Sequence, residues 1–325
     1  MSKHWALGWR GWLHGLFWAT MSMATAAQGQ VAMAGKSLPA DWKPVQLSQT
    51  ASFDMESRYT GQRYRIWLGL PSKPAPEQGY PVLWMLDGQA SFPIMEYVRP
   101  RSASVADTPP GRQKADPMLP GLIVAVGYAS DKPFDNDARA QDYTPPTQGP
   151  TGDLLSKQHG GSAAFLRFLT EELRPYLAQY FPMDATRHTL FGFSYGGLFA
   201  VNTLVTAPQH FQRYWAASPS LWFGQGEVMR NWQQGLASLR QYSPALRVML
   251  TVGQEEQFPS ANLPPERLAH LQERAMVERV QGFAQQLTAQ SKPGVAVSVV
   301  VLPAHDHHDM LMYGVRQVVP FAFAP

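Results

Sequence analysis

The sequence predicts an α/β protein in which helices cover both faces of a mostly parallel sheet. Apolar runs, some continuous and some alternating, recur along the chain and are bounded by turn residues. Helical patterns lie between several of these runs, and strands that alternate with helices form a sheet covered on both faces. The expected strands are residues 63–70, 81–86, 122–127, 188–193, 246–253 and 295–302, with another that ends near Trp215.

Helices are predicted where apolar residues recur at three- and four-residue spacing. Residues 165–180 show one such apolar face, and residues 269–287 give a second helix. Residues 93–120 have the composition of a long insertion, and no internal repeat is visible. We therefore expect a single domain from residue 44 to residue 325.

The N-terminal residues have the composition of a targeting segment. Lys3, His4 and Arg10 give a basic start, an apolar stretch follows from Trp12 to Ala27, and Ala24-Thr25-Ala26 offers a cleavage site. This predicts a signal peptide over 1–27, a linker over 28–43 and a periplasmic location. An uncleaved membrane anchor is the alternative, although the apolar core is short for a membrane span.

Composition excludes several classes of site. The 325 residues contain no cysteine, so disulfides, cysteine–metal sites and a thiol nucleophile are ruled out. A net charge of +3 with no cluster of Lys and Arg argues against a nucleic-acid partner. The 28 prolines and 26 glycines indicate many turns and long loops.

The most informative motif is G-x-S-x-G, formed by residues 192–196 around Ser194. An apolar strand leads into it and a helical pattern follows, which is the context of the nucleophile elbow of an α/β-hydrolase. In that motif the serine sits on a strained turn, and the small residues on each side let strand and helix approach closely. Ser194 is therefore the predicted nucleophile.

Acidic and histidine candidates follow later strands in the order that this fold requires. Glu255 and Glu256 follow the strand 246–253, and His305, His307 and His308 follow the strand 295–302. Since the carboxyl ends of parallel strands meet at one edge of the sheet, these residues should lie near Ser194. A histidine would take the serine proton, and an acid would orient and stabilise that imidazole.

Oxyanion donors are expected from two turns. The backbone N–H of Tyr195 begins the helix after the nucleophile, and the loop after Leu86 would supply a second donor from Gly88 or Gln89.

A zinc site is a rival interpretation of the histidine segment. His305, His307 and Asp309 partly match an H-x-H-x-D-H metal motif, but Met310 occupies the position of the final histidine. We therefore predict no metal and no cofactor.

Further segments extend the pattern beyond the elbow. They are YPVLWMLDGQ (80–89), RAQDYTP (139–145), Gly160-Gly161 with the helix 165–180, GFSYGGLF (192–199), SPSLW (218–222) and DHHDM (306–310). In combination they resemble the putative-esterase family of α/β-hydrolases, and its periplasmic siderophore esterases in particular. The resemblance implies that the chain hydrolyses esters, and that its substrates are ferric catecholate trilactones of the enterobactin and salmochelin type.

The resemblance also implies roles for site residues. The family's base lies in a G-H-G or N-H-G segment, which falls on His307, although Asp306 and His308 replace the usual small or amide residues. His305 and His308 therefore stay open as alternatives. The family's acid lies in a G-x-x-E segment that matches Glu256, but some siderophore esterases use a Ser–His pair alone.

A ferric catecholate is a bulky trianion, so cationic and aromatic side chains should surround the pocket. Arg139, Tyr143, Tyr195 and Trp222 are the candidates, and the alternative is that Tyr143 and Trp222 brace the loops. The expected partner is this small molecule, with a further association with the membrane or a siderophore uptake receptor. A general carboxylesterase, a feruloyl-type esterase, an acyltransferase and a catalytically silent binding protein are the alternative functions.

Overall fold

Parallel strands form the centre of the computed structural model, which describes residues 45–99, 118–130, 132–230, 239, 245–290 and 294–325. The predicted signal peptide (1–27) and linker (28–43) lie outside the described residues. Residues 47–325 form one compact unit. Within the described ranges, no helix combines the length and apolar character needed to span a membrane.

An eight-stranded sheet is formed by the described residues, in the order β1-β2-β4-β3-β5-β6-β7-β8. β2 pairs antiparallel with β1 and with β4, and every other neighbouring pair is parallel. The strands are β1 (Thr50–Glu56), β2 (Arg63–Gly69), β3 (Tyr80–Met85), β4 (Leu122–Tyr128), β5 (Met183–Phe193), β6 (Arg213–Ala217), β7 (Leu246–Gly253) and β8 (Val295–Leu302).

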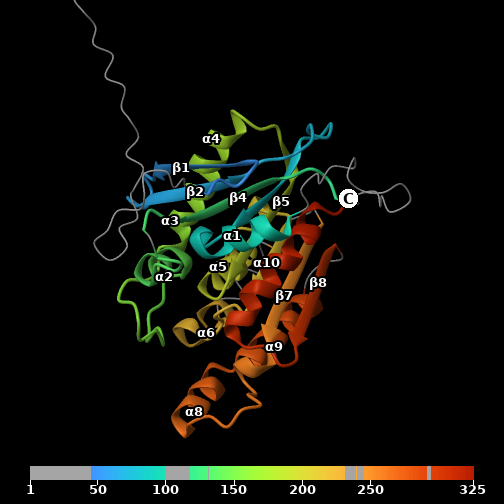
Figure 1. The fold of residues 1–325 in the computed structure, drawn as a ribbon. Helices are drawn as coiled ribbons and strands as arrows, with labels where there is room; N and C mark the ends of the chain where they lie inside the picture. Colours follow the sequence, from blue (N-terminus) through green and yellow to red (C-terminus); the bar gives the residue numbers. More distant parts are fainter. Residues whose placement is uncertain (1–44, 100–117, 131, 231–238, 240–244, 291–293) are drawn as a thin grey trace, which may run out of the picture. The chain divides into compact units, whose positions relative to one another are not determined.

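Helices cover both faces of this sheet, as predicted (Figure 1). α1 and α10 pack on one face, and α2, α3, α5 and α9 lie on the other. The helices are α1 (Gly88–Val98), α2 (Asn136–Tyr143), α3 (Ser162–Arg167), α4 (Arg174–Ala178), α5 (Tyr195–Thr206), α6 (Phe223–Arg230), α8 (Pro265–Arg274), α9 (Met276–Gln290) and α10 (His307–Phe323). Shorter turns are the π-helical η2 (Phe168–Leu173) and the 3₁₀ turns η3 (Pro208–His210) and η4 (Gln254–Glu256).

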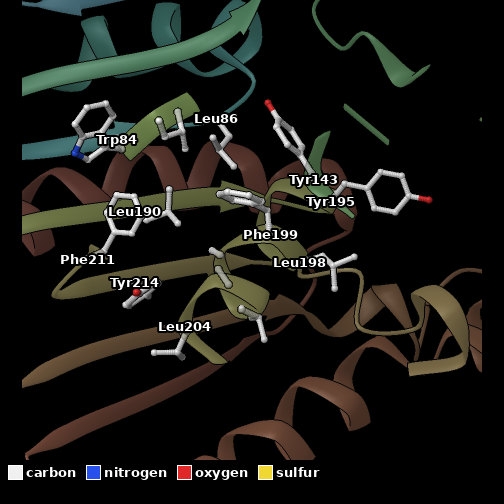
Figure 2. Close-up of a cluster of buried hydrophobic side chains, with 14 of the residues drawn as sticks. Trp84, Leu86, Tyr143, Leu190, Tyr195, Leu198, Phe199, Leu204, Phe211 and Tyr214 are labelled. Atoms are coloured by element: carbon white, nitrogen blue, oxygen red, sulfur yellow. The ribbon is translucent and has the colours of Figure 1, made fainter. Parts of the chain in front are cut away.

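Successive residues of a central strand enter the two cores in turn. In β5, Leu190 packs with the side chains under α5, and Phe191 packs with those under α10. Figure 2 shows Leu190 among Phe199 and Leu204 of α5 and Tyr214 of β6. Because both faces of the strand are buried, its sequence is a continuous apolar run rather than an alternating one.

The first strand and the expected insertion differ from the sequence-based expectation. β1 was not predicted, and its alternating partner β2 lies inside the sheet between β1 and β4. The predicted insertion 93–120 begins instead inside α1, which continues through Pro93 because Phe92 and Met95 on either side are buried in the core. Residues 100–117 lie outside the described part of the chain.

Both long predicted helices are divided. Residues 165–180 form α3, η2 and α4 in succession, so the expected apolar face crosses a π-helical turn. Residues 269–287 are split into α8 and α9 by Ala275, which adopts a left-handed conformation with φ 44°.

Candidate active site

Ser194 occupies a strained turn between β5 and α5. Its backbone has φ 58° and ψ −115°, a conformation that costs a non-glycine residue free energy and that occurs mainly at functional sites. The turn is held by three backbone hydrogen bonds. Ser194 N–H donates to Ala217 O (2.9 Å), and Ser194 O accepts from the N–H groups of Leu198 (2.9 Å) and Ser220 (3.1 Å). The strand, turn and helix expected of a nucleophile elbow are therefore present.

Close backbone contacts require glycine at position 192 of the motif and at position 197, directly after it. A Cβ atom on Gly192 would lie 2.0 Å from Gly196 O, and one on Gly197 would lie 2.9 Å from Ala217 O. The absence of side chains lets α5 start directly above the end of β5, which brings Ser194 to the carboxyl edge of the sheet.

His307 is the first residue of α10, and its position is fixed by the preceding residue. The Asp306 side chain accepts hydrogen bonds from the N–H groups of His308 (2.7 Å) and Asp309 (3.1 Å), and the Asp309 side chain accepts one from the N–H of Asp306 (3.0 Å). These bonds to its carboxylate lower the pKa of Asp306. This capping box makes Asp306 the N-cap of α10, so that the helix begins at His307.

Glu256 is buried and its carboxylate is fully engaged. Oε2 lies 2.5 Å from His307 Nδ1, while Oε1 accepts from Ser218 Oγ (2.5 Å) and from Gly253 N–H (2.8 Å). With Nδ1 held by the acid, Nε2 is the imidazole nitrogen left for a substrate-side proton. The ring of His307 lies against Phe193, the residue before Ser194, at 4.6 Å between centroids.

The alternative histidines and acid have other surroundings. His305 Nδ1 lies 2.7 Å from Pro303 O, and its side chain lines a separate hollow between α1 and α10. His308 is exposed, and Glu255 is bonded to the hydroxyl of Ser260. His308 and Glu255 line the same cleft as Ser194, but the contact between an acid and a histidine there is the one between Glu256 and His307.

The partial zinc motif does not form a ligand set. His307 faces Glu256, His305 faces Pro303 O, and Asp309 accepts from Asp306 N–H. Across the described ranges, no three His, Cys, Asp or Glu side chains come together as metal ligands would.

The predicted oxyanion donors lie at two neighbouring helix starts. Gly88 and Gln89 open α1 and Tyr195 opens α5, and N–H groups in a first turn have no intrahelical acceptor. The two starts are adjacent, since a Cβ on Gly196 would lie 3.4 Å from Leu86 Cβ. The Gln89 side chain is bonded to the carbonyls of Tyr128 and Ser130, so its backbone N–H is the donor that it can offer.

Two hollows of about 290 and 270 Å³ meet at the elbow. The larger one lies against α8, and the smaller one extends toward α2 and residues 153–156. Both are lined by Ser194, Ser220, Trp222, Arg274, His307 and His308. Trp222 therefore lies in the cleft wall, where it was predicted, and Ser194 lies at the junction of the two halves.

The family described as "Putative esterase" matches residues 57–296, which is most of the chain. The chain belongs to this family. A relative, the ferri-bacillibactin esterase BesA of Bacillus subtilis, is 31% identical over 278 residues, which cover 83% of this chain and 88% of BesA.

Solved structures show the same fold. The BES protein from Bacillus cereus is 28% identical with a TM-score of 0.70, covering 86% of this chain and 99% of that one. The enterobactin hydrolase IroE, solved in complex with DFP, is 25% identical with a TM-score of 0.57, covering 83% of this chain and 93% of that one. DFP reacts with activated serines, which indicates that IroE is a serine hydrolase. The present chain, a member of the same esterase family, is likewise a serine hydrolase with the α/β-hydrolase fold.

Two predicted substrate contacts of the esterase, Arg139 and Tyr143, have bonding partners in the loop after β3. Arg139 borders the smaller hollow, but its guanidinium forms a two-bond ion pair with Asp87 (2.9 and 2.9 Å) and donates to Phe193 O. Its charge is therefore compensated. Tyr143 has no exposed surface and its hydroxyl accepts from Asp87 N–H, so it supports the loop after β3 from below.

Tyr195 both lines the cleft and packs inside the protein. It lines the smaller hollow while 8% exposed, and its pKa is raised by burial and by Asp153. Its ring packs against Trp222 and Phe223.

Ser218 is a residue of the site that sequence reasoning missed. It is fully buried, adopts φ 42°, and donates to Glu256 from the end of β6. Its segment, SPSLW, directly follows a strand at the carboxyl edge of the sheet, and that placement is the signal from which it could have been found. The cationic side chains of α8 were also missed.

Proposed function

We propose that this esterase hydrolyses the ester bonds of ferric catecholate siderophores such as enterobactin, in the periplasm. The observation that carries the catalytic part is the pairing of the buried Glu256 with His307 at the cleft that also exposes Ser194. The substrate part is supported by the relatives, because BesA and IroE are named for bacillibactin and enterobactin. The location is supported by the basic and apolar N-terminal residues.

In this proposal Ser194 is the nucleophile, His307 the base and Glu256 the acid. Ser194 Oγ attacks the ester carbonyl while His307 Nε2 takes the hydroxyl proton. His307 then gives that proton to the leaving alkoxide, which releases one hydroxyl of the substrate and leaves an acyl-serine. Water attacks the acyl-serine while His307 accepts a proton from it. The bond between the acyl carbon and Ser194 Oγ then breaks, and His307 returns the proton to Oγ, so each cycle consumes one water and cuts one ester bond.

Electrostatics explain why Glu256 is needed. The buried carboxylate stabilises the positive charge that His307 carries while it holds the serine proton, and it fixes the orientation of the ring. On the substrate side, the N–H groups of Tyr195 and of Gly88 or Gln89 would stabilise the developing oxyanion.

The first test is covalent labelling with a fluorophosphonate probe, followed by mass analysis of products from ferric enterobactin. Wild-type protein should be labelled on Ser194 and should release linear trimer or smaller fragments, whereas Ser194→Ala should show neither. Removal of the nucleophile is expected to lower kcat by roughly 10⁶-fold. Equal labelling of Ser194→Ala would move the nucleophile elsewhere.

The same assay separates the alternative functions. A general carboxylesterase or feruloyl-type esterase should turn over simple aryl esters with no preference for the trilactone. A binding protein should bind ferric enterobactin but resist the probe. Either result would overturn the proposed substrate or activity.

A further inference from the structure

The wall of the cleft opposite Ser194 carries three basic side chains on one side of α8. Arg267, His270 and Arg274 are spaced at i, i+3 and i+7, which places them on the same face of the helix. All three line the larger hollow. α8 lies beyond the carboxyl ends of β7 and β8, whose arrowheads point toward it in Figure 1.

Arg274 is the central member of this basic wall. It is half-buried and lines both hollows, and its guanidinium lies over the Trp222 ring at 4.2 Å from the centroid. Burial lowers the pKa of Arg274, and the neighbouring Arg267 acts in the same direction. The charge is thus held in a partly desolvated place beside another positive charge, which is unfavourable without an anion.

The described residues supply no close counter-ion for this wall. Throughout the described ranges, no carboxylate lies within ion-pair distance of Arg267 or Arg274. Glu273, exposed on the same helix, and Asp153 act on Arg274 only from a distance. Arg139, the other arginine of the cleft, is neutralised by Asp87.

The carboxylates that line the cleft are all occupied. Asp153 accepts from Leu155 N–H and His159, Asp306 caps α10, Glu255 is bonded to Ser260, and Glu256 is bonded to His307. Burial would raise the pKa of Asp153, but its hydrogen bonds outweigh burial and lower that pKa. These bonds hold the carboxylates away from α8, so among the described residues of the cleft Arg267 and Arg274 are the arginines without an ion-pair partner.

We propose that α8 is a specificity wall for anionic aromatic groups, with Arg274 seated on Trp222 as its main contact. A guanidinium stacked on an indole keeps N–H donors at its edge for catecholate oxygens, and the wall offers ring surface beside them. Arg267 adds a second positive charge on the same face of α8, and His270, whose pKa is lowered by burial and by the two arginines, lies between them. This inference rests on the proposed function for the identity of the substrate, but its charge selectivity does not.

The test compares steady-state kinetics on ferric enterobactin and on a neutral aryl acetate. Arg274→Gln should raise KM for the ferric trianion by about tenfold, with little change in kcat, and should lower the preference for the trianion over the neutral ester. Arg274→Lys should recover part of the preference because it keeps the charge but not the stacked plane. Raising the salt concentration should increase the wild-type KM for the trianion more than that of Arg274→Gln.

Arg316→Gln is the matched control. Arg316 is an exposed arginine on α10, on the other face of the sheet and outside both halves of the cleft, so its removal should leave both substrates unaffected. Equal losses on trianion and neutral ester in Arg274→Gln would show a structural role and overturn the proposal. An equal rise in KM for the trianion in Arg316→Gln and in Arg274→Gln would also overturn the proposal.

A binding experiment separates this inference from the proposed function. The Ser194→Ala protein is titrated with ferric enterobactin and with a ferric tris-catechol complex that has no ester, with Trp fluorescence as the signal. One outcome is that wild-type protein hydrolyses no trilactone, but adding Arg274→Gln to Ser194→Ala still weakens binding of both complexes about tenfold. That outcome would support the role of α8 and contradict the proposed substrate. If wild-type protein hydrolyses the trilactone and Arg274→Gln leaves the affinity for both complexes unchanged, only the proposed role of α8 is contradicted.

Discussion

At the scale of single residues, the site depends on how Glu256 is held. Ser218 and Gly253 bind one carboxylate oxygen, which leaves the other directed at His307. A carboxylate fixed by two donors cannot rotate away, so the imidazole keeps one orientation and one tautomer. This arrangement favours a full triad over a Ser–His pair in this esterase.

Glu256→Gln is therefore expected to lower kcat by roughly 10³- to 10⁴-fold with little effect on folding. The amide is isosteric but cannot stabilise the positive imidazole. Stopped-time hydrolysis of a neutral aryl ester measures the loss, and circular dichroism checks the fold.

Glu255→Gln provides the comparison at the adjacent position. Glu255 faces Ser260 rather than His307, so this variant should retain most of the turnover. Loss of activity in Glu255→Gln with retention in Glu256→Gln would reverse the assignment of the acid.

At the scale of elements, the break between α8 and α9 determines where the basic wall points. Ala275 adopts φ 44° and ψ 47°, a left-handed conformation that is costly for a residue with a Cβ atom. The break turns the chain so that α8 lines the cleft while α9 packs on β7 and β8. A single helix over 269–287 would leave the basic side chains without this placement.

Ala275→Gly should stabilise the protein by about 0.5–1 kcal/mol, because glycine adopts the left-handed conformation without strain. Urea unfolding followed by fluorescence measures the change. Ala269→Gly, at an exposed position inside α8, should instead destabilise by about 1 kcal/mol or less. A destabilised Ala275→Gly would contradict the strained cap.

At the scale of the whole molecule, a buried acid joins three elements. The Asp142 carboxyl of α2 accepts hydrogen bonds from the hydroxyls of Tyr64 on β2 (2.7 Å) and Tyr128 on β4 (3.2 Å). Burial raises the pKa of Asp142 to about 7, although the two hydroxyls act in the opposite direction. The folded protein therefore holds a proton that the unfolded chain releases near pH 4.

This proton gives a defined pH dependence of stability. Because the folded pKa is higher than the unfolded one, the contribution of Asp142 is complete below about pH 4 and is lost as pH rises to about 7. Asp142→Asn should remove that loss, so the stability of the variant relative to wild type should rise with pH, by at most about 1.4 kcal/mol per pH unit.

Urea unfolding of both proteins between pH 4 and pH 8 measures this difference. The comparison is made between variants because His188, buried with its pKa lowered to about 3, gives wild type an opposing slope. Parallel stability curves for wild type and Asp142→Asn would show that Asp142 does not titrate in this range.

Much of the fold was readable from local sequence. The central strands were found because burial on both faces leaves continuous apolar runs, and Ser194 was found because its turn needs glycines at fixed spacing. β1 was missed because an edge strand with one exposed face carries a weaker apolar pattern. The break at Ala275 was missed because alanine is a strong helix former and gives no stop signal.

The sequence by itself determined the α/β class, the nucleophile candidate and the chain order of serine, acid and histidine. Those properties follow from short-range patterns and from the edge at which parallel strands end. Only the tertiary structure placed His307 rather than His305 against Glu256, paired Arg139 with Asp87, buried Tyr143, and placed Arg274 over Trp222. Each of these is a contact between residues far apart in the chain, and such contacts depend on how the elements pack.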